Sequence, residues 1–208
     1  MKNNLIPIVV ERENNSERSY DLYSKMLKDR IIFLQGEITD AMANTIVLQL
    51  LHLESENPTA PIYMYINSPG GSVTAGLAIK DTMDYIECPV YTIGLGMCAS
   101  MGAFLLASGE HGYRYALKNT SIMIHQVLGG AQGQVTDMEI RVNFSKSLKD
   151  KLNKYLSEYT KGKTDYNTMV NLCERDNFLT PSEAKHIGLI DHVVNSKKDI
   201  MEEVENEM

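Results

Sequence analysis

The sequence predicts an α/β fold in which parallel strands alternate with helices. From Arg30 onward, short β-rich apolar runs alternate with segments of helical period, and this alternation is typical of α/β domains. The chain has 208 residues, of which 43% are apolar and 23% charged, so one domain can bury a sizeable core without disulfides or a structural metal. The same composition excludes a disordered or collagen-like chain.

The elements predicted for the first half follow the order β-α-β-α-β. Strands are predicted at residues 31–34, 62–66, 90–93 and 122–124, and helices at 42–54 and 72–86. Each helix has one apolar stripe, which would pack against a sheet. This order favours parallel strands joined by right-handed crossovers, and the loops at their carboxyl ends are where we expect the chemistry.

The second half is predicted to be more helical. A capping-box sequence at residues 136–139 opens a helical pattern that runs to about Lys161, roughly 26 residues or 39 Å. A helix of this length would project beyond a compact domain, so we interpret it partly as an interface element. Residues 180–183 form a second capping box with Pro at the first helical position, and residues 189–194 predict a closing strand.

The two ends of the chain differ from its middle. Residues 1–19 lack a helical period and residues 195–208 are mostly charged, so both are expected to be mobile around a single domain at 20–194. The net charge of −7 disfavours nucleic acid and membranes as partners, since clustered Lys and Arg bind both.

The cysteines and the apolar runs indicate the compartment. Three cysteines without metal-ligand spacing predict reduced thiols and no metal site. No run is long enough for a membrane span or a signal peptide. We therefore expect a cytoplasmic protein.

Two glycine-containing segments are candidates for reaction chemistry. Ser100 lies in a glycine-containing segment that follows the strand at 90–93, and it is expected in the first turn of an apolar helix, where helix amides favour an oxyanion. The alternative is an ordinary N-cap serine, and Cys98 departs from the usual nucleophile-elbow pattern. Gly70 and Gly71 begin another helix after a strand and would let backbone amides approach a ligand, or form only a tight turn.

Two further segments supply a base and a carboxylate. His125 ends a buried-looking strand ahead of a glycine pair, and Asp176 lies in a charged stretch that could equally be a solvated helix end. With Ser100 they complete the set of nucleophile, base and orienting carboxylate. On the residues alone, they indicate an α/β hydrolase of acyl compounds.

Five ordered motifs carry a resemblance to a known family. They are Ile-Asn-Ser-Pro-Gly-Gly-Ser at 66–72, Ala-Ser-Met-Gly-Ala-Phe at 99–104, Met-Ile-His-Gln at 123–126, Gly-Ala-Gln-Gly-Gln at 130–134 and Glu-Arg-Asp-Asn-Phe at 174–178. From about Pro7 to Val194 the chain resembles the proteolytic subunits of the Clp protease (the ClpP family). The resemblance implies a crotonase-like α/β fold with a protruding handle at about 126–161, comprising a handle strand and a long helix.

The resemblance also implies roles for the residues of the site. Ser100 would be the nucleophile, His125 the general base and then acid, and Asp176 the carboxylate that orients the histidine. The amides of Gly71 and Met101 would hold the oxyanion. Serine peptidase chemistry of this kind uses no cofactor in this chain.

Substrate and ring contacts are implied in the same way. Gly70, Gln126 and Gly129 would contact substrate, with residues 129–134 forming the handle strand beside it. Arg175 and Gln134 would make contacts between rings. The family stacks two seven-membered rings, here a homo-oligomer, around a closed chamber that hydrolyses unfolded proteins to short peptides.

A hexameric Clp-type AAA+ unfoldase is the implied partner, and ATP is used by that partner alone. Five positions match the family's docking pocket between subunits: Leu51, Tyr63, Tyr65, Tyr85 and Tyr115. Residues 1–19 match the axial gate, and any propeptide is expected to be very short.

Two alternatives from other classes stay open. One is a structural ring subunit that is inactive alone and needs a second, related subunit, since Val127 replaces a proline common in the family and loosens the chain ahead of the handle. The other is an acyl-CoA enzyme on the same fold. Cleavage specificity, the particular ATPase and the physiological substrates do not follow from the sequence.

Overall fold

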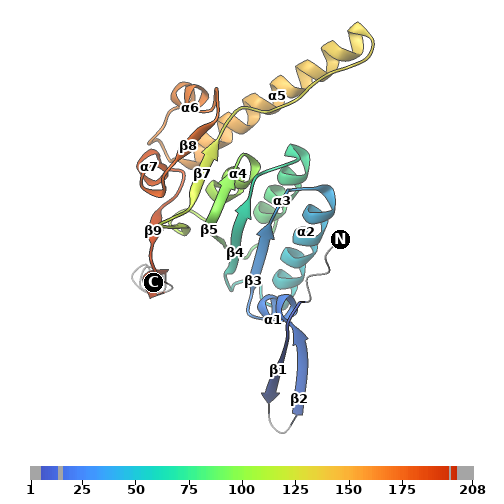
Figure 1. Cartoon of the computed structure of the whole chain (residues 1–208), viewed down its shortest axis with the longest axis vertical. Coiled ribbons are helices and arrows are strands. Elements are labelled where there is room, and N and C mark those ends of the chain that lie inside the picture. Colours follow the sequence, from blue (N-terminus) through green and yellow to red (C-terminus); the bar gives the residue numbers. More distant parts are fainter. Residues whose placement is uncertain (1–5, 14–15, 197, 201–208) are drawn as a thin grey trace.

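The computed structural model describes residues 6–13, 16–196 and 198–200 (Figure 1). The strands are β1 (Ile8–Glu13), β2 (Ser16–Asp21), β3 (Ile31–Gln35), β4 (Ile62–Ser68), β5 (Val90–Ala99), β6 (Arg114–Leu117), β7 (Ser121–Ile124), β8 (Asn177–Leu179) and β9 (His192–Val194). The helices are α1 (Leu22–Lys28), α2 (Asp40–Glu56), α3 (Val73–Tyr85), α4 (Met101–Ala107), α5 (Val135–Tyr159), α6 (Tyr166–Leu172) and α7 (Pro181–Ile187).

The main sheet confirms the prediction of an α/β fold with parallel strands. Strands β3, β4, β5, β6 and β9 lie side by side in that order, each parallel to its neighbours. Strand β7 pairs in parallel with the last part of β5, and β8 pairs antiparallel with β7. The carboxyl ends of β4, β5 and β7 therefore meet at one edge of the sheet.

Alternate residues of β4 face opposite sides of this sheet. Ile62, Met64 and Ile66 are buried in the main core, under the apolar stripes of α2 and α3 (Figure 1). Tyr63 and Tyr65 point to the other side, where they pack on a second, smaller cluster. The two-residue period of a strand thus divides the core into two unequal parts.

Strand β5 is longer than predicted, and it bends. Residues 94–99, expected to leave the strand after residue 93, continue it to Ala99. The bend is a bulge: the pairing passes from Ile66 opposite Gly94 to Ser68 opposite Cys98, so the β5 side carries two extra residues. Gly96 has a φ of 63° there, a conformation glycine adopts without strain. Bulges are common beside active sites because they redirect a strand end.

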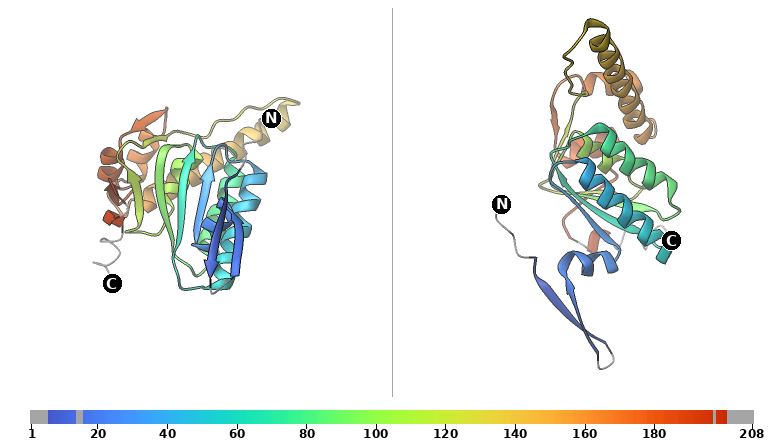
Figure 2. Two further views of the ribbon diagram at one scale, coloured as in Figure 1. Left: turned by 60° about the horizontal axis from the view of Figure 1, so that its bottom comes forward. Right: turned by 90° about the vertical axis from the view of Figure 1, so that its right-hand side faces the viewer.

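Helix α5 is the long projecting helix that the sequence predicts. It spans 25 residues, about 37 Å. Its second half packs over α4, all of whose residues are buried. Its first half extends away from the sheet (Figures 1 and 2), with Ile140, Val142 and Phe144 exposed.

The predicted start of this helix is wrong by two residues, because the predicted N-cap is Thr136 and the observed one is Gln134. Gln134 is the N-cap and makes no side-chain capping bond, and Val135 is the first helical residue. Thr136 therefore lies inside the helix and cannot form the predicted capping box with Glu139. The second capping box is confirmed, because the side chain of Thr180 accepts from the Glu183 amide and the Glu183 side chain accepts from the Thr180 amide.

The segment that precedes α5 is not a strand. Residues 125–134 follow β7 without strand pairing, so the expected handle strand at 129–134 is absent from this part of the single chain. Gly129 and Gly130 are exposed there, and no neighbouring strand of the described chain offers its backbone groups to them. Glycine-rich segments have little intrinsic preference for the extended state, which is consistent with the absence of a strand here.

The N-terminal region forms a hairpin where the sequence predicted no regular element. Strands β1 and β2 pair antiparallel and extend away from the main sheet (Figure 2). Glu11 makes ion pairs with Lys25 and Lys28 of α1, at 3.2 Å and 2.8 Å, and these connect the hairpin to the domain. The parts of the expected mobile ends at 1–5, 14–15, 197 and 201–208 lie outside the described residues.

A buried ion pair connects the last strand to the centre of the molecule. The Arg114 guanidinium, 2% exposed, donates to both carboxylate oxygens of Asp191 at 2.7 Å and 2.6 Å. It also donates to the carbonyl oxygens of Ala107 and Tyr159 at 3.1 Å and 2.9 Å. One side chain thus joins α4, α5 and the segment before β9.

The helices of the described chain give no membrane-spanning candidate, because none combines the length and the apolar character needed to cross a bilayer.

Candidate active site

Ser100 stands at a strained turn between β5 and α4. Its φ of 54° and ψ of −122° are unusual for a residue other than glycine, and such strain concentrates at functional sites. The turn is held by the Ser100 amide, which donates to the carbonyl oxygen of Met123 at 2.8 Å. Ser100 occupies the N-cap position of α4, but its side chain makes no capping bond, so its hydroxyl does not serve the helix as that of an ordinary N-cap serine does.

The antiparallel pair β7–β8 brings His125 and Asp176 together. Ile124 pairs with Asn177 in this register. The next two residues, His125 and Asp176, therefore stand opposite each other just beyond the end of the ladder. Because residues separated by 51 positions meet in this way, their proximity depends on the tertiary fold.

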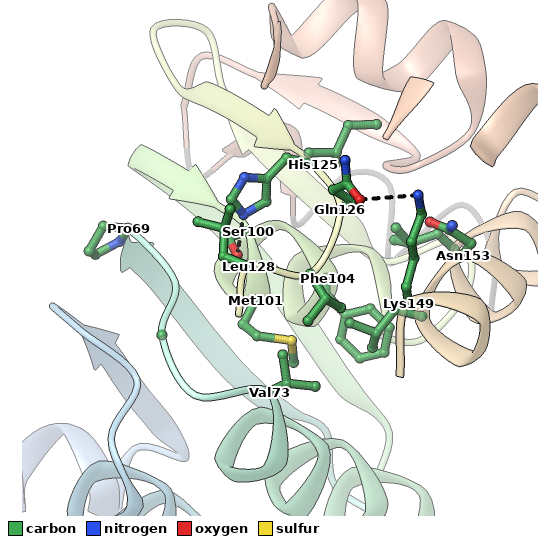
Figure 3. A pocket seen from close by; sticks show the side chains of 15 residues that line it. Pro69, Val73, Ser100, Met101, Phe104, His125, Gln126, Leu128, Lys149 and Asn153 are labelled. Carbon is green, nitrogen blue, oxygen red and sulfur yellow. Dashed lines mark hydrogen bonds between the residues drawn. The ribbon is translucent and has the colours of Figure 1, made fainter. Parts of the chain in front are cut away.

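The three side chains form a continuous chain of hydrogen-bonding groups. His125 Nε2 lies 2.9 Å from Ser100 Oγ, and His125 Nδ1 lies 2.9 Å from Asp176 Oδ1 (Figure 3 draws the Ser100–His125 contact). The His125 side chain is 9% exposed and that of Asp176 65%. The serine and histidine are thus sheltered, whereas the carboxylate faces outward.

The glycine loop after β4 lies directly against this turn. A Cβ placed on Gly70 would approach the Ser100 Cβ to 2.6 Å and the Ala99 carbonyl oxygen to 2.8 Å. Only glycine fits there, and its φ of 95° also favours glycine. The backbone of Gly70 therefore takes the space that a side chain would otherwise fill.

The orientation of Gly71 follows from its bridge to Ile38. The Ile38 amide donates to the Gly70 carbonyl and the Ser72 amide donates to the Ile38 carbonyl, both at 2.8 Å. In such a parallel bridge the amide of Gly71 points away from Ile38. Met101 is the first residue of α4, so its amide has no acceptor within that helix. Both Gly71 and Met101 line the cavity beside Ser100.

That cavity has a volume of about 210 Å³ and a largely apolar wall (Figure 3). Val73, Met101 and Phe104 form one side, and α5 contributes Leu152 and Leu156 on the other. A mainly apolar pocket with a few placed polar groups is the usual form of a substrate site. It can receive an apolar side chain next to the Ser100 hydroxyl.

Two cysteine thiols near these segments are not activated. Burial raises the pKa of Cys98 to about 12, and burial likewise raises that of Cys173 to about 12. A thiol with such a pKa is protonated near neutral pH and is a poor nucleophile. Ser100 is therefore the nucleophile candidate of the site. Cys98 departs from the usual nucleophile-elbow pattern, but this departure removes no reactive group from the site.

Gln126 has different partners from those expected. Its Nε2 donates to the carbonyl oxygen of Glu174 at 2.8 Å, and its Oε1 accepts from Lys149 Nζ at 3.1 Å (Figure 3 draws the Lys149 contact). Lys149 also pairs with the Glu174 carboxylate at 2.9 Å, and this bond lowers the pKa of Glu174. The Gln126 side chain thus bonds within the chain, although the residue lines the cavity.

The other expected substrate and ring residues lie outside the cavity beside Ser100. Gly129 lines a separate hollow of about 200 Å³ between the residues after β7 and α5. Gln134 and Arg175 are exposed, as contacts with another ring would require. The structure therefore leaves their expected roles as predictions.

The five expected docking residues are divided between two faces of the sheet. Leu51 and Tyr85 are 37% and 78% exposed on α2 and α3, whereas Tyr63 and Tyr65 lie half-buried on the opposite face. A single chain does not bring these two groups together.

Tyr115 differs from the other four expected docking residues, because it is fully buried in the described chain and presents no surface to a partner there. It packs with Ile93, Val194 and Ile200, and its ring stacks on His192 at a centroid distance of 5.3 Å. A strand period assigns Tyr115 a face of the sheet but does not reveal that β9 and the residues after it cover that face.

Sequence reasoning missed the cavity-lining residues of α5. Lys149 and Asn153 line the cavity from this helix, and Asn153 is only 3% exposed. The one signal available was their spacing of four, which places them on one helical face with Leu152 and Leu156 beside them. A helical period does not indicate which distant element that face meets.

A comparison with protein families gives a match. The family model for Clp protease matches residues 14–197 of the chain. The match includes the serine, histidine and aspartate described above and both glycines of the loop.

Proposed function

The chain belongs to the Clp protease family, and on this premise we propose that it is a serine endopeptidase whose triad is Ser100, His125 and Asp176. The single observation that supports the proposal most strongly is the pair of 2.9 Å contacts, from Ser100 Oγ to His125 Nε2 and from His125 Nδ1 to Asp176 Oδ1. Family membership supports a peptidase of the ClpP type.

In the first half of the reaction, Ser100 Oγ attacks the carbonyl carbon of a peptide bond. His125 Nε2 takes the hydroxyl proton, and Asp176 holds Nδ1–H and stabilises the imidazolium that forms. The carbonyl oxygen becomes an oxyanion, which the amides of Gly71 and Met101 stabilise in this proposal. His125 then donates its proton to the leaving amine, and an ester to Ser100 remains.

In the second half, water replaces the amine. His125 removes a proton from the water, the resulting hydroxide attacks the ester carbonyl, and Ser100 Oγ leaves with the proton returned by His125. The side chain that precedes the cleaved bond occupies the apolar cavity beside Ser100. This chemistry needs no cofactor from the chain.

The proposal for the wider setting rests mainly on family membership. We propose a crotonase-like fold and a cytoplasmic particle of two stacked seven-membered rings, in which a hexameric Clp-type AAA+ unfoldase delivers unfolded protein and alone consumes ATP. The exposed half of α5, with Arg175 and Gln134, supports contact between rings. Leu51 and Tyr85 on one chain and Tyr63 and Tyr65 on the next support a docking surface between subunits.

One experiment tests the peptidase assignment. Purified protein and its Ser100→Ala variant are compared for cleavage of a fluorogenic peptide and for labelling by a fluorophosphonate, with particle mass measured by light scattering. We expect cleavage and labelling in a particle of about fourteen subunits, and neither in Ser100→Ala. An assembled wild-type particle that is neither labelled nor active would contradict the proposal and favour the structural subunit that needs a second chain.

A further inference from the structure

Three polar side chains form a closed network beside the catalytic pair. Lys149 Nζ donates to Glu174 Oε2 at 2.9 Å and to Gln126 Oε1 at 3.1 Å, and Gln126 Nε2 donates to the Glu174 carbonyl oxygen at 2.8 Å. Each residue comes from a different segment: α5, the chain after β7 and the chain before β8. The network therefore joins the projecting helix to both segments that carry His125 and Asp176.

This inference rests on the proposed function. We propose that Lys149 is a positioning residue for the reaction: by holding Gln126 and Glu174, it sets the spacing of His125 and Asp176 and couples that spacing to α5. Gln126 directly follows His125, and Glu174 lies two residues before Asp176. Lys149 thus acts on the triad through its neighbours.

The strand ladder alone does not hold the pair. Strands β7 and β8 share three paired positions, and the last is Ile124 with Asn177. His125 and Asp176 both lie beyond that end, and the Asp176 side chain is 65% exposed. Beyond the His125–Asp176 contact itself, the Lys149 network is the next connection between the two segments, so it supports their alignment where the backbone pairing has stopped.

The energetics predict an effect on rate more than on stability. Lys149 and Glu174 have side chains 29% and 54% exposed, and partly exposed ion pairs contribute little to folding free energy. Geometry is more sensitive, since a displacement of about 1 Å at a catalytic group can cost roughly 100-fold in rate. The hydrogen bond from Lys149 lowers the pKa of Glu174, so the carboxylate side of this contact is ionised near neutral pH.

The test compares Lys149→Met, which keeps the length of the side chain but removes its donor, with Lys149→Arg, which keeps the charge. Lys151→Met is the matched control, because Lys151 is an exposed lysine of the same helix. We expect Lys149→Met to lower kcat and the fluorophosphonate labelling rate about tenfold while KM changes less than about twofold. Lys149→Arg should recover most of the loss, and Lys151→Met should match the wild type.

Wild-type kcat and labelling in Lys149→Met would overturn the proposal, and so would a Lys149→Arg variant no better than Lys149→Met. If light scattering shows that Lys149→Met fails to assemble, Gln126→Ala and Glu174→Ala remove the network from its other side. Assembled particles of these two variants should show the same fall in kcat, and unchanged kcat in both would also refute the role of Lys149. A wild-type protein that is not labelled at Ser100 contradicts the peptidase assignment instead.

Discussion

Gly70 and Ser100 are in such close contact that a Cβ on the glycine would lie 2.6 Å from the Cβ of the serine. We predict that Gly70→Ala displaces the Ser100 turn and lowers the free energy of unfolding by more than about 2 kcal/mol, because the overlap adds to the strain of an alanine at φ 95°. Peptide cleavage should fall with it. Urea denaturation followed by circular dichroism, beside a cleavage assay, measures both effects.

The control is Gly130→Ala, where a Cβ would meet no atom within 4 Å. Its free energy of unfolding should stay within about 0.5 kcal/mol of the wild type. Equal stability of Gly70→Ala and Gly130→Ala would show that the loop moves aside easily and does not define the position of Ser100.

The backbone of Ser100 should store measurable strain. Ser100→Gly and Ser100→Ala both remove the nucleophile, but only glycine relaxes a turn at φ 54°. We predict that Ser100→Gly is about 1 kcal/mol more stable than Ser100→Ala, or about 2–4 °C higher in Tm. Calorimetry of the two inactive variants decides this, and an Ala variant as stable as the Gly variant would indicate an unstrained turn.

Asp176→Asn should show how much the reaction depends on the orientation of His125, because Ser100 itself is unchanged in this variant. An amide can stabilise the wrong histidine tautomer and cannot balance an imidazolium, so we predict a fall in kcat of about 10³–10⁴-fold with little change in KM. Steady-state kinetics on a short peptide check this. A loss below tenfold would mean that a water molecule at this exposed position orients His125 nearly as well as the Asp176 carboxylate does.

The parts of this structure that follow from neighbouring residues could be predicted, and they include α2, α3, α5 and the parallel strands. Apolar period and turn chemistry extend over a few positions, and they correctly placed Ser100 at the start of a helix and His125 at a strand end. The start of α5 was missed because Thr136 and Glu139 have capping-box spacing, which does not determine where the helix begins. The extension of β5 to Ala99 was missed because a glycine-rich stretch resembles a loop.

The parts that depend on distant contacts could not be predicted from local pattern. Nothing near Lys149 indicates that its ammonium group meets Gln126 and Glu174, since the three come from separate segments. Likewise, the strand period of Tyr115 is compatible with either an exposed or a covered face. These contacts arise when the chain folds back on itself and have no short-range signature in the sequence.

The Arg114–Asp191 pair should make stability depend on pH. Burial acts to raise the pKa of Asp191, but the hydrogen bonds and charge of Arg114 more than offset this and lower it. Unfolded Asp titrates near 3.9, so the unfolded chain binds a proton first as the pH falls. The stabilisation is complete above that pKa and is lost as the pH drops through the lower folded value.

Asp191→Asn should remove this dependence and lower the free energy of unfolding by about 3 kcal/mol at neutral pH, because buried Arg114 loses its counter-charge. Asp81→Asn, at an exposed position of α3, should behave as the wild type. Denaturation at several pH values between about 2 and 7 compares the three proteins. If Asp191→Asn is as stable as the wild type at neutral pH, the ion pair makes no net contribution to stability.

The cavity beside Ser100 should select the side chain before the cleaved bond. Val73 lies on its wall, and Val73→Phe would fill part of it. We predict a fall of about tenfold in kcat/KM for peptides with Leu or Met at that position and little change for Ala. Thr74→Phe, an exposed neighbour outside the cavity, should leave the preference unchanged. Equal losses for all peptides would mean that substrate enters elsewhere.

The pairing of β7 with β8 also bears on the order in which the chain folds. His125 and Asp176 are 51 residues apart, and α5 and α6 form the loop that their meeting must close. Closing so long a loop costs entropy before its contacts repay it, and such pairings tend to form late. We therefore expect the triad to assemble among the last steps of folding. A newly made chain would then gain the ability to cut peptides only after the rest of its own structure is complete.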